Sequence, residues 1–187
     1  PVPSAWISLS SDEDDLSIFI NYLLQAVRSL FPSSLKETSN LIAGGKVQAW
    51  KGLGHYLIND LDEIEDEFVV VLDDYHLIHN TKIHNLIDEL LRFIPQRMHL
   101  VLITRRDPPL SIRRLRALSR VHMVRMEELN FSPDCTIELL RKAANINLSD
   151  SSPAHKIVGK TEGWITAIRL ILLHTRTEAE LLEIVNN

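Results

Sequence analysis

The sequence predicts an α/β fold with a parallel sheet, followed by a small helical part. Three short apolar segments that are typical of strands lie at residues 5–9, 68–72 and 98–104. Segments with a helical spacing of apolar residues separate them, and this alternation is typical of parallel βαβ units. From residue 128 onward only helical patterns remain. We therefore expect an α/β core over residues 1–127 and a helical subdomain over residues 128–187.

The middle apolar segment, Phe68 to Leu72, runs directly into two carboxylates, Asp73 and Asp74. Its apolar residues do not alternate with polar ones, which predicts a strand covered on both faces of a parallel sheet. The two carboxylates would lie at the carboxyl end of that strand, where open α/β sheets bind ligands. There they could hold a hydrated metal ion or orient an attacking water. Asp is also a common turn residue and helix cap, so the pattern alone leaves a structural role open.

A helix is expected after the first strand. Apolar residues recur at i, i+3 and i+4 between Leu16 and Phe31, until Pro32 stops the pattern. Acidic residues at positions 12–15 supply a cap and a favourable charge at the N-terminus of this helix. Residues 33–45 are polar and predict a connecting loop.

The rest of the chain continues the alternation and then becomes helical. Further elements are expected as helices over residues 50–61, 83–94 and 112–118 and as a strand over Val121 to Met126. Ser132 and Pro133 then start a helix, with Ser at the cap and Pro in the first turn. Later helical patterns cover residues 137–144, 153–161, 165–175 and 178–185.

Composition excludes several classes of protein. With 187 residues, 45% hydrophobic and 24% charged, the chain has the composition of an ordinary globular protein. A single cysteine, Cys135, excludes an internal disulfide and favours a reducing cytoplasm. No apolar run approaches the roughly 20 residues needed to span a bilayer, so we expect no membrane association. The net charge of −5 argues against a nucleic-acid-binding module.

Other reactive side chains have simpler interpretations. His76, His79 and His84 are closely spaced but lack cysteine partners or a ligand set that fits zinc. His76 could instead position Asp74, and Cys135 lacks an identifiable histidine partner, which favours an inert thiol. Eight arginines between residues 97 and 125 could face phosphates or a partner, or could form a solvated surface.

Five segments, taken together, resemble a known family. In chain order they read AWISL, FVVVLDDYHLI, MHLVLITRRDPPL, LNFS and TEGWITAIRL. This set resembles the nucleotide-binding region of the MalT-like STAND ATPases, which occur in large LuxR-type bacterial transcriptional activators. The resemblance covers nearly the whole chain. It implies a P-loop-NTPase-like parallel sheet followed by a helical lid, with ATP and Mg²⁺ as cofactors.

The resemblance also assigns roles to single residues. It implies that Asp73 is the Walker B acid that holds Mg²⁺ through water, and that Asp74 polarises the attacking water. Arg105 resembles the sensor arginine at the γ-phosphate, where a guanidinium would stabilise developing charge. Arg106 takes this role if the register differs by one residue.

The helical part and one missing motif complete the comparison with the family. Gly163 and Trp164 sit where related switch ATPases carry a Gly-x-Pro signature against the adenine, although Ile165 replaces the proline. The phosphate-binding motif G-x-x-x-x-G-K-[ST] is absent, and the nearest string, at residues 42–47, predicts only a loop. We expect a chain that starts just downstream of the P-loop strand. The strand of residues 98–104 should then pair with the Val121 strand or expose an edge.

Two kinds of function remain, with a third less favoured. The first is a nucleotide switch in a longer transcriptional regulator, in which ATP and an inducer favour a self-oligomer. DNA binding would belong to a C-terminal domain, because this sequence holds no helix-turn-helix, and the isolated chain should bind ATP weakly and hydrolyse none. The second is a non-enzymatic regulatory or protein-interaction module that keeps only the fold. A metal-dependent nuclease built on Asp73 and Asp74 is less favoured, since no further carboxylates converge in the sequence.

Overall fold

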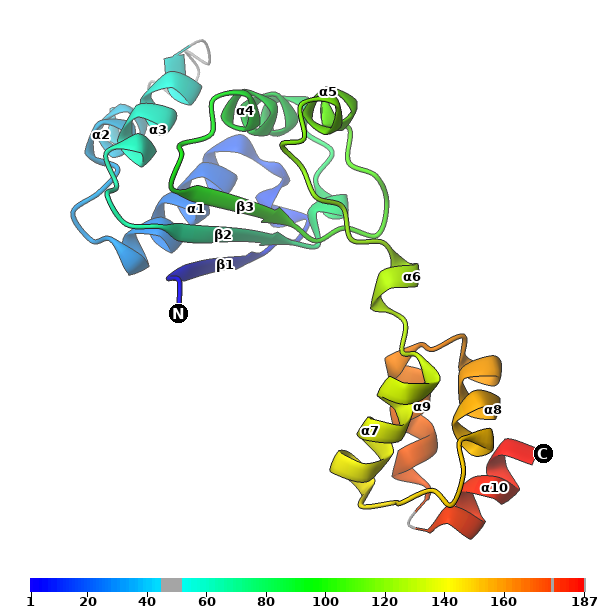
Figure 1. Ribbon diagram of the computed structural model, residues 1–187. Coiled ribbons are helices and arrows are strands. Elements are labelled where there is room, and N and C mark those ends of the chain that lie inside the picture. The colour runs from blue at the N-terminus through cyan, green and yellow to red at the C-terminus, as the bar shows by residue number, and fades with distance from the viewer. Residues whose placement is uncertain (45–51, 176, 187) are drawn as a thin grey trace. The chain divides into compact units, whose positions relative to one another are not determined.

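Figure 1 shows the computed structural model, which describes residues 1–44, 52–175 and 177–186. The chain divides into two compact units, residues 1–118 and residues 119–187. Each unit has its own hydrophobic core. The first unit combines strands with helices and the second is helical, so the predicted class of an α/β fold with a helical subdomain is confirmed.

The first unit keeps the predicted alternation of strands and helices. Its elements are β1 (Ser4–Ser8), α1 (Leu16–Leu30), α2 (Lys36–Ala43), α3 (Leu53–Asp62), β2 (Phe68–Asp73), α4 (Thr81–Arg92), β3 (Met98–Leu102) and α5 (Ile112–Ala117). Two short 3-10 helices, η1 (Asp12–Asp14) and η4 (Tyr75–Leu77), lie in the loops after β1 and β2. Both loops therefore carry ordered backbone at the ends of the strands.

The three strands form a parallel sheet in the order β1–β2–β3. Ser8 pairs with Asp73 at one end of the sheet, and Phe68 pairs with Met98 at the other. Because all three strands run in the same direction, the loops that follow them meet at one edge. We call this edge the carboxyl end of the sheet and the opposite edge the amino end.

Within the described residues of the first unit, helices cover only one face of this sheet. The two crossovers, β1 to β2 and β2 to β3, advance in the same direction, and right-handed crossovers then place their helices on one face. This covered face carries Ile7, Val70 and Leu100, which belong to or pack against the main core with α1, α3 and α4. The opposite face, which we call the bare face, carries Trp6 and Val101.

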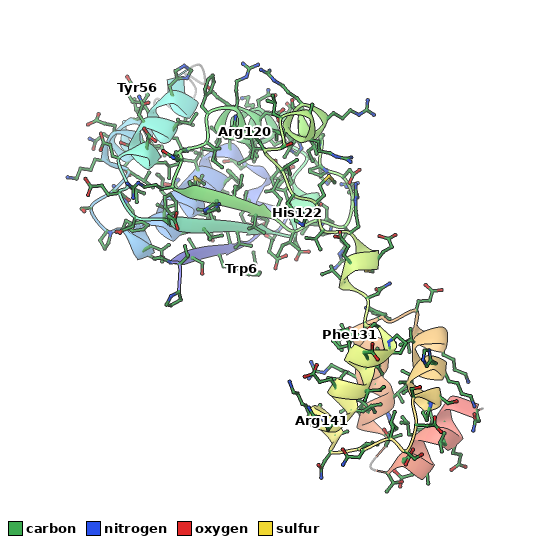
Figure 2. All side chains as sticks on the ribbon, in the orientation of Figure 1. Trp6, Tyr56, Arg120, His122, Phe131 and Arg141 are labelled. Atoms are coloured by element: carbon green, nitrogen blue, oxygen red, sulfur yellow. The ribbon has the colours of Figure 1, made fainter. Side chains whose placement is uncertain are left out.

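The bare face carries apolar side chains at its centre, and several of them are open to solvent. Trp6 projects from β1 on this face and is 58% exposed, and Val101 and Ile103 are each 41% exposed (Figure 2). Val71 is nonetheless buried, because Trp6 and Val101 flank it in register on the two neighbouring strands. Phe68, Val70, Val71 and Leu72 are thus buried as expected, but within the described part of the first unit helices cover only one of the two faces. An unbroken apolar run predicts burial, but neighbouring strands can supply that burial without a second layer.

The outer edge of β3 carries no paired strand in this part of the chain. The strand predicted over Val121 to Met126 is wrong, since residues 121–125 have no regular structure and α6 (Met126–Leu129) begins at Met126. A strand is stable only where its backbone groups find partners on a neighbour, and an apolar pattern cannot supply that neighbour. The alternative expectation, an exposed edge, is the one that holds.

Helix α2 was not predicted, because residues 33–45 are mostly polar. A buried hydrogen-bond pair anchors this helix to α3. Asp60 Oδ2 accepts hydrogen bonds from the backbone nitrogen of Thr38 (2.7 Å) and from its hydroxyl (2.6 Å). The side chains of Asp60 and Thr38 are both buried, so this contact replaces the apolar stripe that usually signals a packed helix.

Side-chain caps explain where two covering helices begin. Asp15 accepts hydrogen bonds from the backbone nitrogens of Ser17 and Ile18 at the start of α1. Asn80 accepts one from Lys82 at the start of α4. The predicted cap of the first helix is therefore confirmed, and α1 ends at Leu30, as predicted, just before the proline at residue 32.

The second unit is a small helical bundle. Besides α6 it contains α7 (Pro133–Ala144), α8 (Ser152–Thr161), α9 (Ile165–Leu173) and α10 (Glu178–Asn186). Its core consists of Leu140, Ile146, Ile157, Ile168 and Leu181. Ser132 caps α7 through the backbone nitrogen of Cys135, as its sequence predicts. No helix in the described ranges is long and apolar enough to cross a bilayer.

Candidate functional site

Asp73 and Asp74 form a tight turn at the carboxyl end of β2. Asp73 is the last residue of the strand, and its carbonyl oxygen accepts a hydrogen bond from the backbone nitrogen of Leu9 (3.0 Å). Its carboxylate Oδ1 accepts one from the backbone nitrogen of Asp74 (2.9 Å). Asp74 has a left-handed backbone, with φ of 55°, which Asp tolerates better than most residues. The pair therefore builds the turn and also presents its carboxylates at the end of the sheet.

His76 lies against the second of these carboxylates. Its Nδ1 atom is 3.7 Å from Asp74 Oδ1, which is too long for a hydrogen bond. The same Nδ1 atom is buried and has no hydrogen-bond partner in the described structure. The Asp74 side chain is close to half exposed, whereas the His76 side chain is mostly buried. A buried imidazole nitrogen of His76 therefore lies close to the carboxylate of Asp74, which solvent can reach.

Two buried residues, Tyr75 and His84, connect the turn to helix α4. The hydroxyl of Tyr75 lies 2.9 Å from Nδ1 of His84 on α4. Burial, with a smaller contribution from Asp88, raises the pKa of Tyr75, and burial lowers the pKa of His84. Both shifts favour the neutral form of the group, so the contact is a hydrogen bond between two uncharged side chains. The backbone nitrogen of Tyr75 also donates to the carbonyl of Ile103 after β3 (3.0 Å).

Acidic residues that follow β1 also bind the loop between β2 and α4. Asp14 Oδ1 accepts hydrogen bonds from the backbone nitrogens of His79 (2.7 Å) and Asn80 (2.8 Å). Glu13 accepts two bonds of 2.6 Å from the backbone and hydroxyl of Ser10. These bonds, the side-chain one first, lower the pKa of Glu13 despite its burial. The sequence indicated only a helix cap in this cluster, because the partners of Asp14 lie more than 60 residues away along the chain.

Two arginines follow β3 at this end of the sheet. Arg106 Nη2 donates to the carbonyl oxygen of His76 (2.8 Å) and lies 3.5 Å from Nδ1 of His79. Arg105 is exposed. The structure therefore brings both predicted arginines to the same edge as the predicted carboxylates, Asp73 and Asp74. Arg106 is the one that contacts the loop after β2.

Gly163 and Trp164 lie in the second unit, at the turn between α8 and α9. Gly163 has φ of 75°, and a side chain there would come within 2.6 Å of the carbonyl oxygen of Phe131. The backbone nitrogen of Phe131 donates to the carbonyl of Gly163 (2.8 Å). Trp164 is the N-cap residue of α9 and is 52% exposed. Packing therefore explains the glycine, whereas the tryptophan is not part of the core formed by the described residues of this unit.

Asp73, the predicted metal ligand, is not part of a larger cluster of metal-binding side chains among the described residues. Among the residues that the structure describes, no three His, Cys, Asp or Glu side chains form a group suited to a metal ion. One oxygen of Asp73 is used by the turn, which leaves the other for a ligand. Mg²⁺ commonly takes one or two carboxylates and completes its shell with water and phosphate oxygens, so Asp73 fits such an ion. Residues 45–47 of the string nearest to a P-loop lie outside the described residues.

Comparison with known proteins identifies relatives along nearly the whole chain. The chain is 28% identical to the HTH-type transcriptional regulator MalT of Vibrio cholerae over 186 residues, which is 97% of this chain and 20% of that protein. It is 29% identical over 185 residues to the protein of the same name in Vibrio parahaemolyticus, with the same coverage. The MalT of Yersinia enterocolitica is 28% identical over 173 residues, or 91% of this chain and 19% of that protein.

The chain thus spans about a fifth of the length of the curated relatives it matches. No family model matches it. The resemblance to MalT-like regulators indicated by the five sequence segments is confirmed, because these relatives match the chain across both of its units.

Proposed function

Since the chain is similar over nearly its whole length to one region of MalT-type transcriptional regulators, we propose that it is the nucleotide-dependent switch region of a longer regulator. The observation that carries the proposal is the meeting of two carboxylates and two arginines at the carboxyl end of the sheet. Asp73 and Asp74 end the central strand, and Arg105 and Arg106 follow its neighbour. This edge is where parallel α/β sheets bind phosphates and nucleotides.

Each side chain has a chemical task in this proposal. Asp73 holds Mg²⁺ through water, and the ion neutralises charge on the phosphates of ATP when bound. Asp74, which is accessible, orients the water that attacks the terminal phosphate. Arg105 stabilises the charge that develops there, and Arg106 ties the two loops together.

The open edge of β3 and the exposed bare face support a site that is completed by a further segment of the longer protein. β3 has an open edge, and the bare face exposes Trp6 and Val101. Unpaired edges and apolar sheet faces are usually covered in soluble proteins. In this proposal, a strand and helix that carry the missing P-loop pair with β3 in the longer protein. The isolated chain then holds only the carboxylate and arginine half of the site.

The helical unit acts as the lid in this proposal. Trp164 contacts the adenine, and Gly163 sets the turn that presents it. ATP together with an inducer then favours a self-associating form of the regulator, a bistable element biased by ligand. The regulator acts on DNA through another domain, and its place of action is the cytoplasm.

Nucleotide titration of two proteins tests the proposal. We expect this chain alone to show no micromolar affinity for ATP with Mg²⁺, and a longer protein that includes a P-loop segment to bind it. In that longer protein Asp73→Asn should abolish most of the Mg²⁺ dependence of binding, and Arg105→Ala should slow hydrolysis. Asp62→Asn, an exposed carboxylate at the opposite end of the sheet, is the matched control. Unchanged Mg²⁺ dependence in Asp73→Asn would sink the assignment of the carboxylate pair.

A non-enzymatic interaction module is the second candidate. The observation that favours it is that Asp73 and Asp74 already have a structural task, because one carboxylate and one left-handed residue make the turn. In that case Asp73→Ala, which removes the acceptor of the turn, would lower the thermal stability of the longer protein, and Asp73→Asn would leave nucleotide binding unchanged. A nuclease is not favoured, since within the described ranges no third carboxylate joins the pair in a group suited to a metal.

A further inference from the structure

The carboxylate of Asp74 differs from the carboxylates around it, because no described residue donates a hydrogen bond to it. Those of Asp73, Asp14 and Glu13 each accept at least one hydrogen bond that fixes their direction. The basic side chain beside Asp74 is that of His76, whose Nδ1 atom lies 3.7 Å from Asp74 Oδ1. A carboxylate that orients a water needs a fixed direction, since the reacting atoms must be aligned.

The imidazole of His76 also lacks a hydrogen-bond partner at this point. Its Nδ1 nitrogen is buried and makes no hydrogen bond within the described structure. A buried polar atom without a partner costs stability, so folded proteins keep few of them. An imidazole nitrogen can donate when it carries the proton, and a carboxylate can accept. Two complementary groups therefore lie side by side without bonding.

The backbone that carries the imidazole is held in place. In the turn η4, the backbone nitrogen of Leu77 donates to the carbonyl of Asp74 (3.0 Å). The carbonyl of His76 accepts a hydrogen bond from Arg106 Nη2 (2.8 Å), which connects it to the loop after β3. The side chain of Asp74 is close to half exposed and can turn toward the ring. A closer approach of roughly 0.5 Å would bring the two atoms to hydrogen-bond distance.

From these observations we propose that His76 is a positioning residue for Asp74. When nucleotide completes the site, the protonated Nδ1 of His76 donates to Oδ1 of Asp74 and fixes the carboxylate that orients the attacking water. This inference rests on the proposed function, in which Asp74 has that task. Catalytic hydrogen bonds are often long before substrate binds and shorten afterwards, which accounts for the separation of 3.7 Å. His76 keeps its proton throughout and transfers none.

The thermal stability of this chain alone is the first test, because the alternative role predicts the opposite sign. If the ring of His76 served only to pack the loop, its replacement should lower Tm. Removing a buried nitrogen that has no partner should not, so we expect His76→Leu to melt at the same temperature as the wild type or higher. A Tm that falls by several degrees would show that packing needs the ring, and it would overturn the proposal.

Single-turnover hydrolysis of ATP by the longer protein that includes a P-loop segment is the second test. His76→Leu should react about ten- to hundredfold more slowly, with unchanged affinity for ATP and Mg²⁺. His76→Asn should recover most of the rate, because its amide nitrogen can occupy the position of Nδ1. His76→Gln should not, since its amide nitrogen lies nearer the position of Nε2. His155→Leu, which changes an exposed histidine on α8, is the control and should react normally.

A double variant distinguishes a positioning role from an independent one. Because His76 acts through Asp74, His76→Leu combined with Asp74→Asn should react no more slowly than Asp74→Asn alone. Losses that multiply would overturn the proposal, as would a wild-type rate in His76→Leu or equal rates in His76→Asn and His76→Gln. If Asp74→Asn alone left hydrolysis unchanged, or if the wild type hydrolysed no ATP, the proposed function would fail together with this inference.

Discussion

The two faces of the sheet show how differently similar side chains can be used. Val70 on the covered face is fully buried within the main core, whereas Val101 on the bare face is 41% exposed. Both are β-branched residues of strands, and nothing in their local sequence separates them. The difference comes from the crossovers, which place every covering helix on one side. The comparison indicates that the packing that stabilises this unit lies on the covered face, whereas the bare face is free to pack against a further segment.

The largest expected effect contrasts one residue from each face. Phe68→Ala should lower the free energy of unfolding by about 3–5 kcal/mol, since it empties space in a fully buried part of the core. Val101→Ala should cost less than about 1 kcal/mol, because its side chain already contacts solvent. Urea denaturation monitored by fluorescence measures both. A large loss in Val101→Ala would show that the bare face is covered in solution.

A smaller effect is expected where the covering layer is held by polar contacts. Asp60→Ala should cost about 2–3 kcal/mol, because it leaves the backbone nitrogen and hydroxyl of Thr38 buried without a partner. Asp62→Ala, at the exposed end of the same helix, should stay within about 0.5 kcal/mol of the wild type. Thermal denaturation of the pair compares them, and equal shifts in Tm would contradict the anchoring of α2 by Asp60.

A pH-dependent effect is expected beneath the carboxylate turn. Burial lowers the folded-state pKa of His84, so the unfolded chain binds a proton at a higher pH than the folded chain. Stability should therefore be full above the unfolded pKa of about 6.5 and fall as the pH drops below it, by at most about 1.4 kcal/mol per pH unit. Denaturation between pH 7.5 and about 5 measures this slope. In His84→Gln the part of the slope due to this histidine should vanish, and an unchanged slope would contradict the assignment.

The smallest effect on stability is expected at Trp6. Trp6→Gln should change the free energy of unfolding by no more than about 0.5 kcal/mol, because the indole is mostly exposed. It should nevertheless reduce binding of an apolar fluorescent dye, since it removes the largest exposed side chain of the bare face. Dye titration of wild type and variant checks this. Leu170→Gln on the helical unit is the control for general loss of apolar surface.

The fold could be predicted where its causes are local. Helices α1, α4 and α7 have an apolar stripe and a capping residue within the same short segment, so their sequence determines them. Helix α2 was missed because its anchor, Asp60, is 22 residues away from Thr38. The strand expected at Val121 failed for the opposite reason, since its pattern was present but a partner strand was not.

For the candidate site, the sequence predicted which residues share one edge of the sheet but not the contacts between their loops. The positions of Asp73, Asp74 and Arg105 at one edge follow from parallel strands, which the sequence indicates. The contact of Arg106 with His76 depends on the shape of two loops and could not be read from either alone. The roles of the carboxylates as metal ligand and base stay predictions.

The turn at Gly163 has a consequence for comparing this chain with its relatives. Any side chain at Gly163 would collide with the backbone of Phe131, so packing alone requires a glycine there, whatever the unit binds. Trp164 is not held in this way, because it is half exposed and starts a helix without a side-chain cap. If the helical unit binds nucleotide as proposed, drift at residue 164 beside an unchanging residue 163 is the pattern that would mark a lineage in which this binding is lost.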